Sequence, residues 1–326
     1  MTRRLTLLAL LAGVLVAVPG PHDHARAASG GTNGRIAFVR YTGGAPLEDV
    51  YMVGPASGLT ANLTNDPATS DTAPAWSPDG TRVALQRSGP VEGIWVLEAA
   101  SGAMSFVPHT DHGFQPAWSP GGDWIAFSRD AGGDAELWMV RADGSDLVQL
   151  TNNADEDREA SWSPGGDRIA FTREGPGATT NIMLLALGGG GELAVTPAGG
   201  FDGAPDWSPD GKRIAFNRFL PGDGNRVFTI APNGAALTQR TFGGGPTGFN
   251  DVHPAWSPDG ARIAFARGGD QDDGLPFHIH TVPGHRQDRP GHQRPGRGPA
   301  AELAAAVAST PRMLNWRPHA LDGEAA

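Results

Sequence analysis

A segment of about fifteen residues recurs five times in this chain, and the repeat constrains the fold more than any other feature. The first copy, residues 74–85, reads PAWSPDGTRVAL, and the others begin at residues 116, 160, 205 and 254. The tryptophans of the five copies are Trp76, Trp118, Trp162, Trp207 and Trp256, spaced by 42, 44, 45 and 49 residues. A period in the forties, with short strands and a Pro-Asp-Gly turn, is typical of a radial β array.

The two ends of the chain each carry half of the repeat. Residues 35–38, RIAF, match the β-type run that follows each Trp-Ser-Pro segment, but no such segment precedes them. Residues 314–318, LNWRP, match the first half around Trp316, and no β-type run follows. We therefore expect the C-terminal strand to pair with the N-terminal blade, which closes a ring and removes two exposed sheet edges.

The remaining predicted strands give the number of strands in each unit. A third strand is predicted in each unit, and a fourth follows a Gly-bearing turn, as at 147–151 after the turn ADGS. Four strands in each of six units predict an all-β fold, a six-bladed β-propeller over residues 33–318. Residues 283–312 break the repeat as an irregular insertion rich in Pro, Gly, Arg and His, for which a binding element is the alternative. Residues 319–326 are a tail.

The N-terminus has the pattern of a secretory signal peptide at residues 1–27. Arg3 and Arg4 precede the apolar run 5–18, and Ala25-Arg26-Ala27 has the form of a cleavage site. Residues 28–32 are a short linker, and an uncleaved anchor is the alternative. We expect a secreted or periplasmic protein, with no membrane span after signal cleavage.

Composition limits the classes of partner that we expect. The formal net charge of −10 disfavours nucleic acid and anionic membrane surfaces, and we expect a monomer. The chain has 0 cysteines, so disulfides and a lipid-modified cysteine are excluded and packing must stabilise the fold.

The repeat W-S-P-D-G-x-R-I-A-F, with the turn ADGS before LVQLT, resembles the WD40-like (PD40) repeats of the TolB propeller family. The resemblance covers about residues 33–318. It implies a propeller outside the cytoplasm that serves as a docking platform for proteins, and related propellers precede serine peptidase domains. TolB itself carries an α/β domain before its propeller, whereas here the expected signal is followed almost directly by residues 35–38.

A regular pair of charges accompanies each repeat. Five residues before the tryptophan stand Asp71, Asp157, Asp202 and Asp251, and the other two units have Gly113 and Pro311 there. Eleven residues after each tryptophan stands an arginine, and Arg40 is its equivalent in the split blade. Folding each hairpin about its Pro-Asp-Gly turn brings the Asp and Arg positions opposite one another, around the mouth of the central channel.

Two interpretations of this charged ring remain open. A cross-strand Asp–Arg pair that ties each blade would contribute about 0.2–1 kcal/mol if exposed. Alternatively, a ring of carboxylates captures a cation or a basic peptide, and Arg40 and Arg129, which face Pro311 and Gly113, are free for an anionic ligand. The candidate partner-binding residues are Asp71, Asp157, Asp202, Asp251, His253, Arg40 and Arg129.

Other chemistry finds less support in the sequence. A Ca²⁺ site at the mouth is an alternative, but no loop has the alternating Asp spacing of a dedicated calcium loop. His278 and His280 share a strand face, and His253 and His112 lie near the mouth, yet no third zinc ligand is identified. No G-x-S-x-G elbow and no cysteine nucleophile occur.

We therefore expect a non-catalytic propeller, without cofactor or metal, that binds a protein or peptide partner at the channel mouth. The alternative is a propeller enzyme, a hydrolase or lyase, whose site is built from the four aspartates and His253. Binding of a small ligand or a carbohydrate is a third option. The repeat tryptophans, with Trp316, are expected to form the core between blades.

Overall fold

The computed structural model describes residues 15–16, 34–41, 48–54, 58–130, 132–242, 250–268 and 278–284, and these residues form strands and turns only. The first three sheets consist of β1 (Leu15–Val16), β2 (Ile36–Tyr41), β3 (Glu48–Val53) and β4 (Thr60–Asn62); β5 (Ser70–Trp76), β6 (Arg82–Ser88), β7 (Gly93–Glu98) and β8 (Met104–Phe106); and β9 (Gly113–Trp118), β10 (Trp124–Asp130), β11 (Ala135–Arg141) and β12 (Val148–Gln149). The other three consist of β13 (Glu156–Trp162), β14 (Arg168–Glu174), β15 (Thr180–Ala186) and β16 (Gly191–Ala194); β17 (Asp202–Trp207), β18 (Ile214–Leu220), β19 (Gly224–Ile230) and β20 (Thr238–Gln239); and β21 (Asn250–Trp256), β22 (Arg262–Gly268) and β23 (His278–Pro283).

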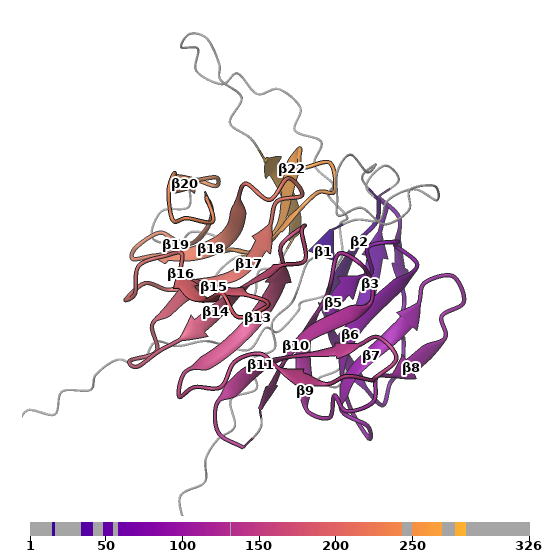
Figure 1. Cartoon of the computed structure of the whole chain (residues 1–326). Coiled ribbons are helices and arrows are strands. Elements are labelled where there is room, and N and C mark those ends of the chain that lie inside the picture. Colours follow the sequence, from indigo (N-terminus) through magenta and orange to yellow (C-terminus); the bar gives the residue numbers. More distant parts are fainter. Residues whose placement is uncertain are drawn as a thin grey trace, which may run out of the picture.

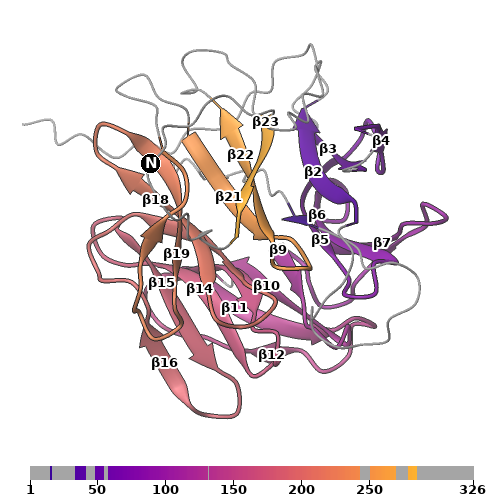
Figure 2. The same ribbon diagram turned by 90° about the horizontal axis from the view of Figure 1, so that it is seen from above.

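The six sheets confirm the predicted six-bladed propeller. Within each sheet the strands follow one another in chain order and pair antiparallel, and we number the sheets as blades one to six. In the part of the chain that the structure describes, five blades have four strands and the sixth has three. The sheets follow each other around the molecule, so that β21–β23 lie near β2 and β3 (Figures 1 and 2).

The first blade differs from the expectation at its inner edge. The segment beside β2 is β1, with Leu15 opposite Ala37 and Val16 opposite Ile36, instead of the C-terminal segment around Trp316. The edge of β2 presents unpaired backbone groups that any extended segment can satisfy, and two residues of the apolar N-terminal run do so here. Residues 314–318 and the rest of the insertion beyond Gly284 lie outside the described residues.

The Trp-Ser-Pro-Asp-Gly segment forms the turn between the first two strands of its blade. In blade two the Ser77 hydroxyl accepts a hydrogen bond from Arg82 N at 2.9 Å, and Ser77 Oγ lies 2.6 Å from an Asp79 carboxylate oxygen. Gly80 has φ +69°, a conformation that side chains rarely adopt. The same serine-to-backbone bond recurs in blades three to six, so the motif fixes one hairpin geometry throughout.

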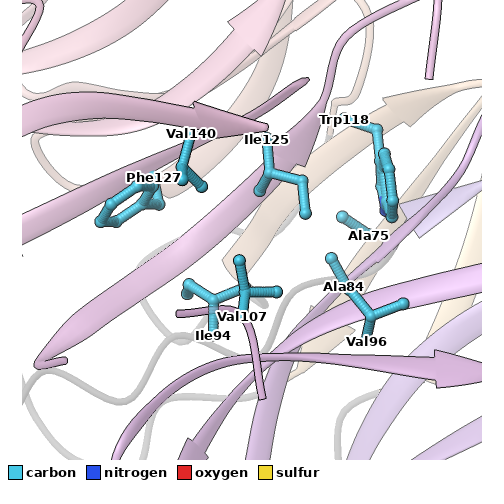
Figure 3. Packing of buried hydrophobic residues seen from close by; sticks show 9 residues of the cluster. All are labelled: Ala75, Ala84, Ile94, Val96, Val107, Trp118, Ile125, Phe127 and Val140. Atoms are coloured by element: carbon cyan, nitrogen blue, oxygen red, sulfur yellow. The ribbon is translucent and has the colours of Figure 1, made fainter. Parts of the chain in front are cut away.

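The hydrophobic core is divided into six clusters, one between each pair of neighbouring blades. Figure 3 shows the cluster between blades two and three, where Trp118 and Phe127 pack on Ala84 and Ile94. Each described repeat tryptophan packs against the preceding blade, and Trp162 also donates a hydrogen bond to Ala117 O at 3.1 Å. Full burial of a side chain such as Phe127 contributes about 1.5–3 kcal/mol, so the interfaces between blades hold much of the stability.

The ring closes through packing between the last blade and the first. Ile36 and Val53 of blade one form a cluster with Ala264 and Ala266 of blade six.

A second recurring hydrogen bond holds the outer segment of a blade. In it, a threonine hydroxyl accepts a hydrogen bond from the backbone N–H of the third strand, as Thr196 does from Ile182 N at 2.9 Å. Within the described ranges, no helix is long and apolar enough to cross a membrane.

Candidate functional site

The Asp–Arg positions of the repeat lie at the end of each sheet opposite the Pro-Asp-Gly turns, and we call this end the mouth face. The inner strand begins there and the second strand ends there, which pairs Asp71 with Arg87 in the register of β5 and β6. The Arg Nε and Nη2 each donate to one carboxylate oxygen of the Asp. These two distances are 2.7 and 2.8 Å for Asp71–Arg87, 2.7 and 2.7 Å for Asp157–Arg173, 2.6 and 2.8 Å for Asp202–Arg218, and 2.5 and 2.7 Å for Asp251–Arg267.

These four carboxylates are not presented to solvent. Their side chains are 0% exposed, while those of the partner arginines are 10–26% exposed. The bonds to Asp raise the pKa of each arginine, and Arg173, Arg218 and Arg267 also lie over the phenylalanine two residues before them in the strand. Buried, bidentate pairs of this kind tie the inner hairpin, as the cross-strand interpretation expects.

Blades one and three lack this pair. Arg129 lies opposite Gly113 in the register of β9 and β10, and its guanidinium lies 5.5 Å from the centre of the Trp138 ring. Arg40 lies over the Tyr51 ring at 4.4 Å. Pro311, its expected neighbour, is outside the described residues. Among the described residues, neither arginine forms an ion pair with a carboxylate.

The same two blades carry a buried acid on the third strand, which the sequence reading missed. Asp49 is opposite Arg40 and Glu136 is opposite Arg129 in the strand register. Both carboxylates bind their own outer segment instead, Asp49 accepting from Asn62 at 2.9 Å and Glu136 from Thr151 at 2.5 Å. Burial raises the pKa of Glu136, and hydrogen bonds from Asn153 and Thr151 oppose that shift. Their positions opposite Arg40 and Arg129 in neighbouring strands are the sequence signal that could have identified these two acids.

His253 lies in a bulge of the inner strand. Each described inner strand from β5 to β21 has a register shift three residues before its tryptophan, where Ala73, Gln115, Glu159, Ala204 and His253 have φ between +47° and +58°. Both imidazole nitrogens of His253 are shielded from water and have no hydrogen-bond partner among the described residues. Burial lowers the pKa of His253, and the carboxylate of Glu159 opposes this shift. The Asp251 carboxylate is held by Arg267, so the two candidates do not form a joint site.

Asp206 joins three blades and was also missed. From blade five it accepts a hydrogen bond from Trp256 N of blade six at 2.6 Å and from the Ser161 hydroxyl of blade four at 3.4 Å. The other described copies have Ala or Ser at this position. Asp206 keeps some exposed surface, yet its carboxyl lies deep in the protein, and burial raises its pKa to about 7.

The described histidines do not converge. His280 stacks on Phe265 at 5.8 Å between ring centres, His278 is exposed, and His112 lies 3.6 Å from Glu92. No group of three or more His, Cys, Asp or Glu suited to a metal occurs in the part of the chain that the structure describes.

Aromatic side chains add an apolar component to the mouth face. Phe242 follows Thr241, whose hydroxyl accepts from Val227 N at that end of blade five, and Phe242 is 67% exposed. Phe201 and Phe219 flank the Asp202–Arg218 pair and meet edge to face at 6.0 Å. Phe201 and Phe219 are half-buried, so Phe242 is the exposed member of the three, and aromatic residues are enriched on protein-binding surfaces.

Comparison with known proteins agrees with the propeller fold. Residues 29–180 match the family model described as PD40, TolB beta propeller domain. Over these residues the propeller is of the TolB type. A TolB homolog from Chlorobaculum tepidum is 32% identical over 118 residues, which are 36% of this chain and 26% of the homolog. The chain spans less than a third of the length of the curated relatives it matches.

Solved structures share the TolB-type fold. The crystal structure of TolB from Acinetobacter baumannii superposes with a TM-score of 0.61 and 20% identity, covering 77% of this chain and 63% of that one. An oligogalacturonate lyase from Vibrio parahaemolyticus reaches 0.53 with 14% identity, covering 76% and 74%. At these identities the likeness extends to the fold alone, and the same fold carries enzymes as well as TolB.

Proposed function

We propose that this TolB-type propeller is a non-catalytic protein of the cell envelope or the secreted fraction that binds a protein or peptide partner through its mouth face. The observation that carries the proposal is that all four aspartates are buried and bound by an arginine. Each of these carboxylates is bonded by its arginine and 0% exposed, so it braces the mouth and is itself not free for acid–base chemistry. Several relatives are named Tol-Pal system protein TolB, which supports a location in the envelope.

We expect the partner to contact residues of the mouth face that take no part in the Asp–Arg pairs. Arg40 and Arg129 have no carboxylate partner among the described residues, and Phe242 of blade five is exposed on the same face. The four aspartates and His253 act by holding the inner strands in place. A supporting role is consistent with buried bidentate pairs, because they stabilise geometry and offer no charge to a partner.

The enzyme alternative rests on the lyase and on a relative named as a peptidase, YuxL of Bacillus subtilis. It requires two or more free carboxylates, or a carboxylate with His253, around a common point. The bonds from Arg87, Arg173, Arg218 and Arg267 disfavour it.

Two substitutions at opposite ends of one short strand test the proposal. Phe242 follows β20 on the mouth face, and Leu237 precedes β20 at the other end and is 44% exposed. Phe242→Ser is expected to reduce partner recovery from the envelope fraction at least fivefold, whereas Leu237→Ser leaves it unchanged. Equal recovery with both variants and the wild type would reject binding through the mouth face.

A further inference from the structure

The guanidinium of Arg129 is in a different state from its four counterparts. Arg87, Arg173, Arg218 and Arg267 each use Nε and Nη2 to bind a carboxylate of their own blade. Arg129 makes one long contact, from Nη1 to His109 O at 3.5 Å, and within the described ranges its Nε and Nη2 have no partner. It is half-buried, and the Trp138 ring supports it from one side. The donor pair that binds a carboxylate in four blades therefore has no such partner in blade three among the residues that the structure describes.

Blade three cannot supply the missing carboxylate from position 113. A Cβ atom on Gly113 would lie 2.7 Å from Thr110 O and 2.9 Å from Phe127 Cδ2, closer than real side chains approach. The Gly113 N–H also donates to Thr110 O at 2.8 Å, which holds the chain in this tight path. Any side chain at this position would require the backbone to shift.

Two acids close to Arg129, Glu136 and Asp130, are hydrogen-bonded elsewhere. The oxygens of Glu136, the cross-strand neighbour of Arg129, accept from the Thr151 hydroxyl and from Asn153 N, both at 2.5 Å. Asp130 turns into its own loop and accepts from Gly132 N at 2.9 Å and Gly133 N at 3.1 Å. Asp111 and Asp134 are exposed in the adjoining loops and, with Asp130, carry negative charges that oppose an incoming anion.

The loop above Arg129 is also the shortest of its kind. The threonine that follows the outer strand stands 8 residues before the next tryptophan here, from Thr110 to Trp118, against 11 to 15 residues in the sequence of the corresponding segments. A shorter loop covers less of the mouth face, so the unbonded edge of the Arg129 guanidinium remains within reach of a partner.

We propose that Arg129 binds a carboxylate group of the protein partner, with Nε and Nη2 donating to its two oxygens as they do in the Asp–Arg pairs. The partner's carboxylate then takes the place of the aspartate that binds the arginine in four other blades. Arginine suits this role because its planar guanidinium matches a carboxylate in a bidentate geometry and stays charged at all physiological pH values. The inference rests on the proposed function, since it names the chemistry of the partner at the mouth face.

Arginine side-chain NMR tests the site without the partner. In ¹⁵N-labelled protein, N-acetylaspartate N-methylamide supplies a side-chain carboxylate and N-acetylalanine a terminal one. We expect the Nε–Hε signal of Arg129 to move and saturate in the millimolar range with at least one probe. The signals of Arg87, Arg173, Arg218 and Arg267 stay in place, because their donors are occupied. Arg129→Lys assigns the signal.

The relative response to the two probes tells whether a side chain or a chain terminus fits better. Sodium chloride at equal ionic strength is the control for screening. A static Arg129 signal, or movement of all five signals together, would overturn the inference.

A second measurement uses the partner and separates the two proposals. Arg129→Gln is expected to weaken partner binding about tenfold or more, and Arg129→Lys to restore part of it. If Phe242→Ser reduces recovery but Arg129→Gln does not, the mouth face binds a partner and the carboxylate inference is wrong. If neither variant changes recovery, binding at the mouth face itself is refuted, and the carboxylate inference is refuted with it.

Discussion

At the scale of single residues, the Asp–Arg pair is the unit that shapes the mouth face. A carboxylate that is 0% exposed must be bonded, since an unpaired buried charge is strongly unfavourable. The arginine in turn depends on that carboxylate, and the guanidinium of Arg218 lies over Phe216, which belongs to the core cluster between blades four and five. The pair therefore couples the inner hairpin to the packing between blades, which explains why it recurs where no ligand needs to bind.

Removal of one aspartate is predicted to destabilise the fold. Asp202→Ala leaves the Arg218 guanidinium without its partner in a site where the side chain is 20% exposed. We expect the free energy of unfolding to fall by about 2–4 kcal/mol, less than for a fully buried pair because Arg218 reaches some water. Urea unfolding measures this. Asp111→Ala, at an exposed aspartate on the same face, is the matched control and should leave the midpoint near that of the wild type. A similar midpoint for both variants would contradict the role of the pair.

At the scale of the strands, the bulge in each inner strand and the contacts across it distinguish one blade from another. The Glu159 carboxylate accepts from Ala204 N of the next blade at 2.6 Å, and Glu159 N donates to Gln115 of the preceding blade at 3.3 Å. Asp206 adds bonds to blades four and six. Blades three to six are thus linked by polar contacts between their inner strands as well as by hydrophobic packing.

The Asp206 link is predicted to make stability depend on pH. Burial raises the pKa of Asp206 from 3.8 to about 7, so the folded state prefers the neutral carboxyl more than the unfolded state does. The contribution of Asp206 is fully present below about pH 4 and is lost as the pH rises through 7. At 1.36 kcal/mol per pKa unit, the loss is on the order of 1–3 kcal/mol once the partial exposure is considered.

Asp206→Asn keeps an acceptor for Trp256 N and removes the titration. Its free energy of unfolding, followed by urea denaturation from pH 4 to 8, should therefore fall less than that of the wild type. The pKa of Glu48 is also raised to about 7 by burial, but Glu48 is present in both proteins and cancels in the difference. Parallel curves for the two proteins would show that Asp206 does not titrate in this range.

The sequence predicts the elements of one hairpin well and the contacts between hairpins poorly. The Pro-Asp-Gly turn fixes the register, and this is why Asp71 could be placed opposite Arg87 from spacing alone. The depth of the same carboxylate could not be predicted, because it depends on the neighbouring blade. Asp206 and Glu159 were missed for the same reason, since their partners are 45 to 50 residues away in sequence.

At the scale of the whole molecule, the inner strand of the first blade depends on whether the expected signal peptide is cleaved. β1 lies within the expected signal peptide, so cleavage after Ala27 removes the segment that pairs with Ile36 and Ala37. The inner edge of β2 is then open to the repeat half around Trp316, as the end pieces of the sequence predict. The cluster of Ile36 and Val53 with Ala264 and Ala266 does not depend on β1.

Processing of the N-terminus is therefore a direct prediction. Protein isolated from the periplasm or the medium should begin at Ala28, as measured by its intact mass and by N-terminal peptide mapping. A mature protein that retains Met1 and the run 5–18 would show that the signal is kept as an anchor and that β1 remains in the first blade.

Binding through the mouth face is tested most directly by photo-crosslinking with p-benzoylphenylalanine. The probe replaces Phe242 at the mouth end of β20 or Leu237 at its other end, in protein expressed in cells of the source organism. We expect a discrete crosslinked protein from position 242 that is absent from position 237 and weakened by Arg129→Gln. Crosslinks from position 237 alone, or the same products from both positions, would contradict this expectation.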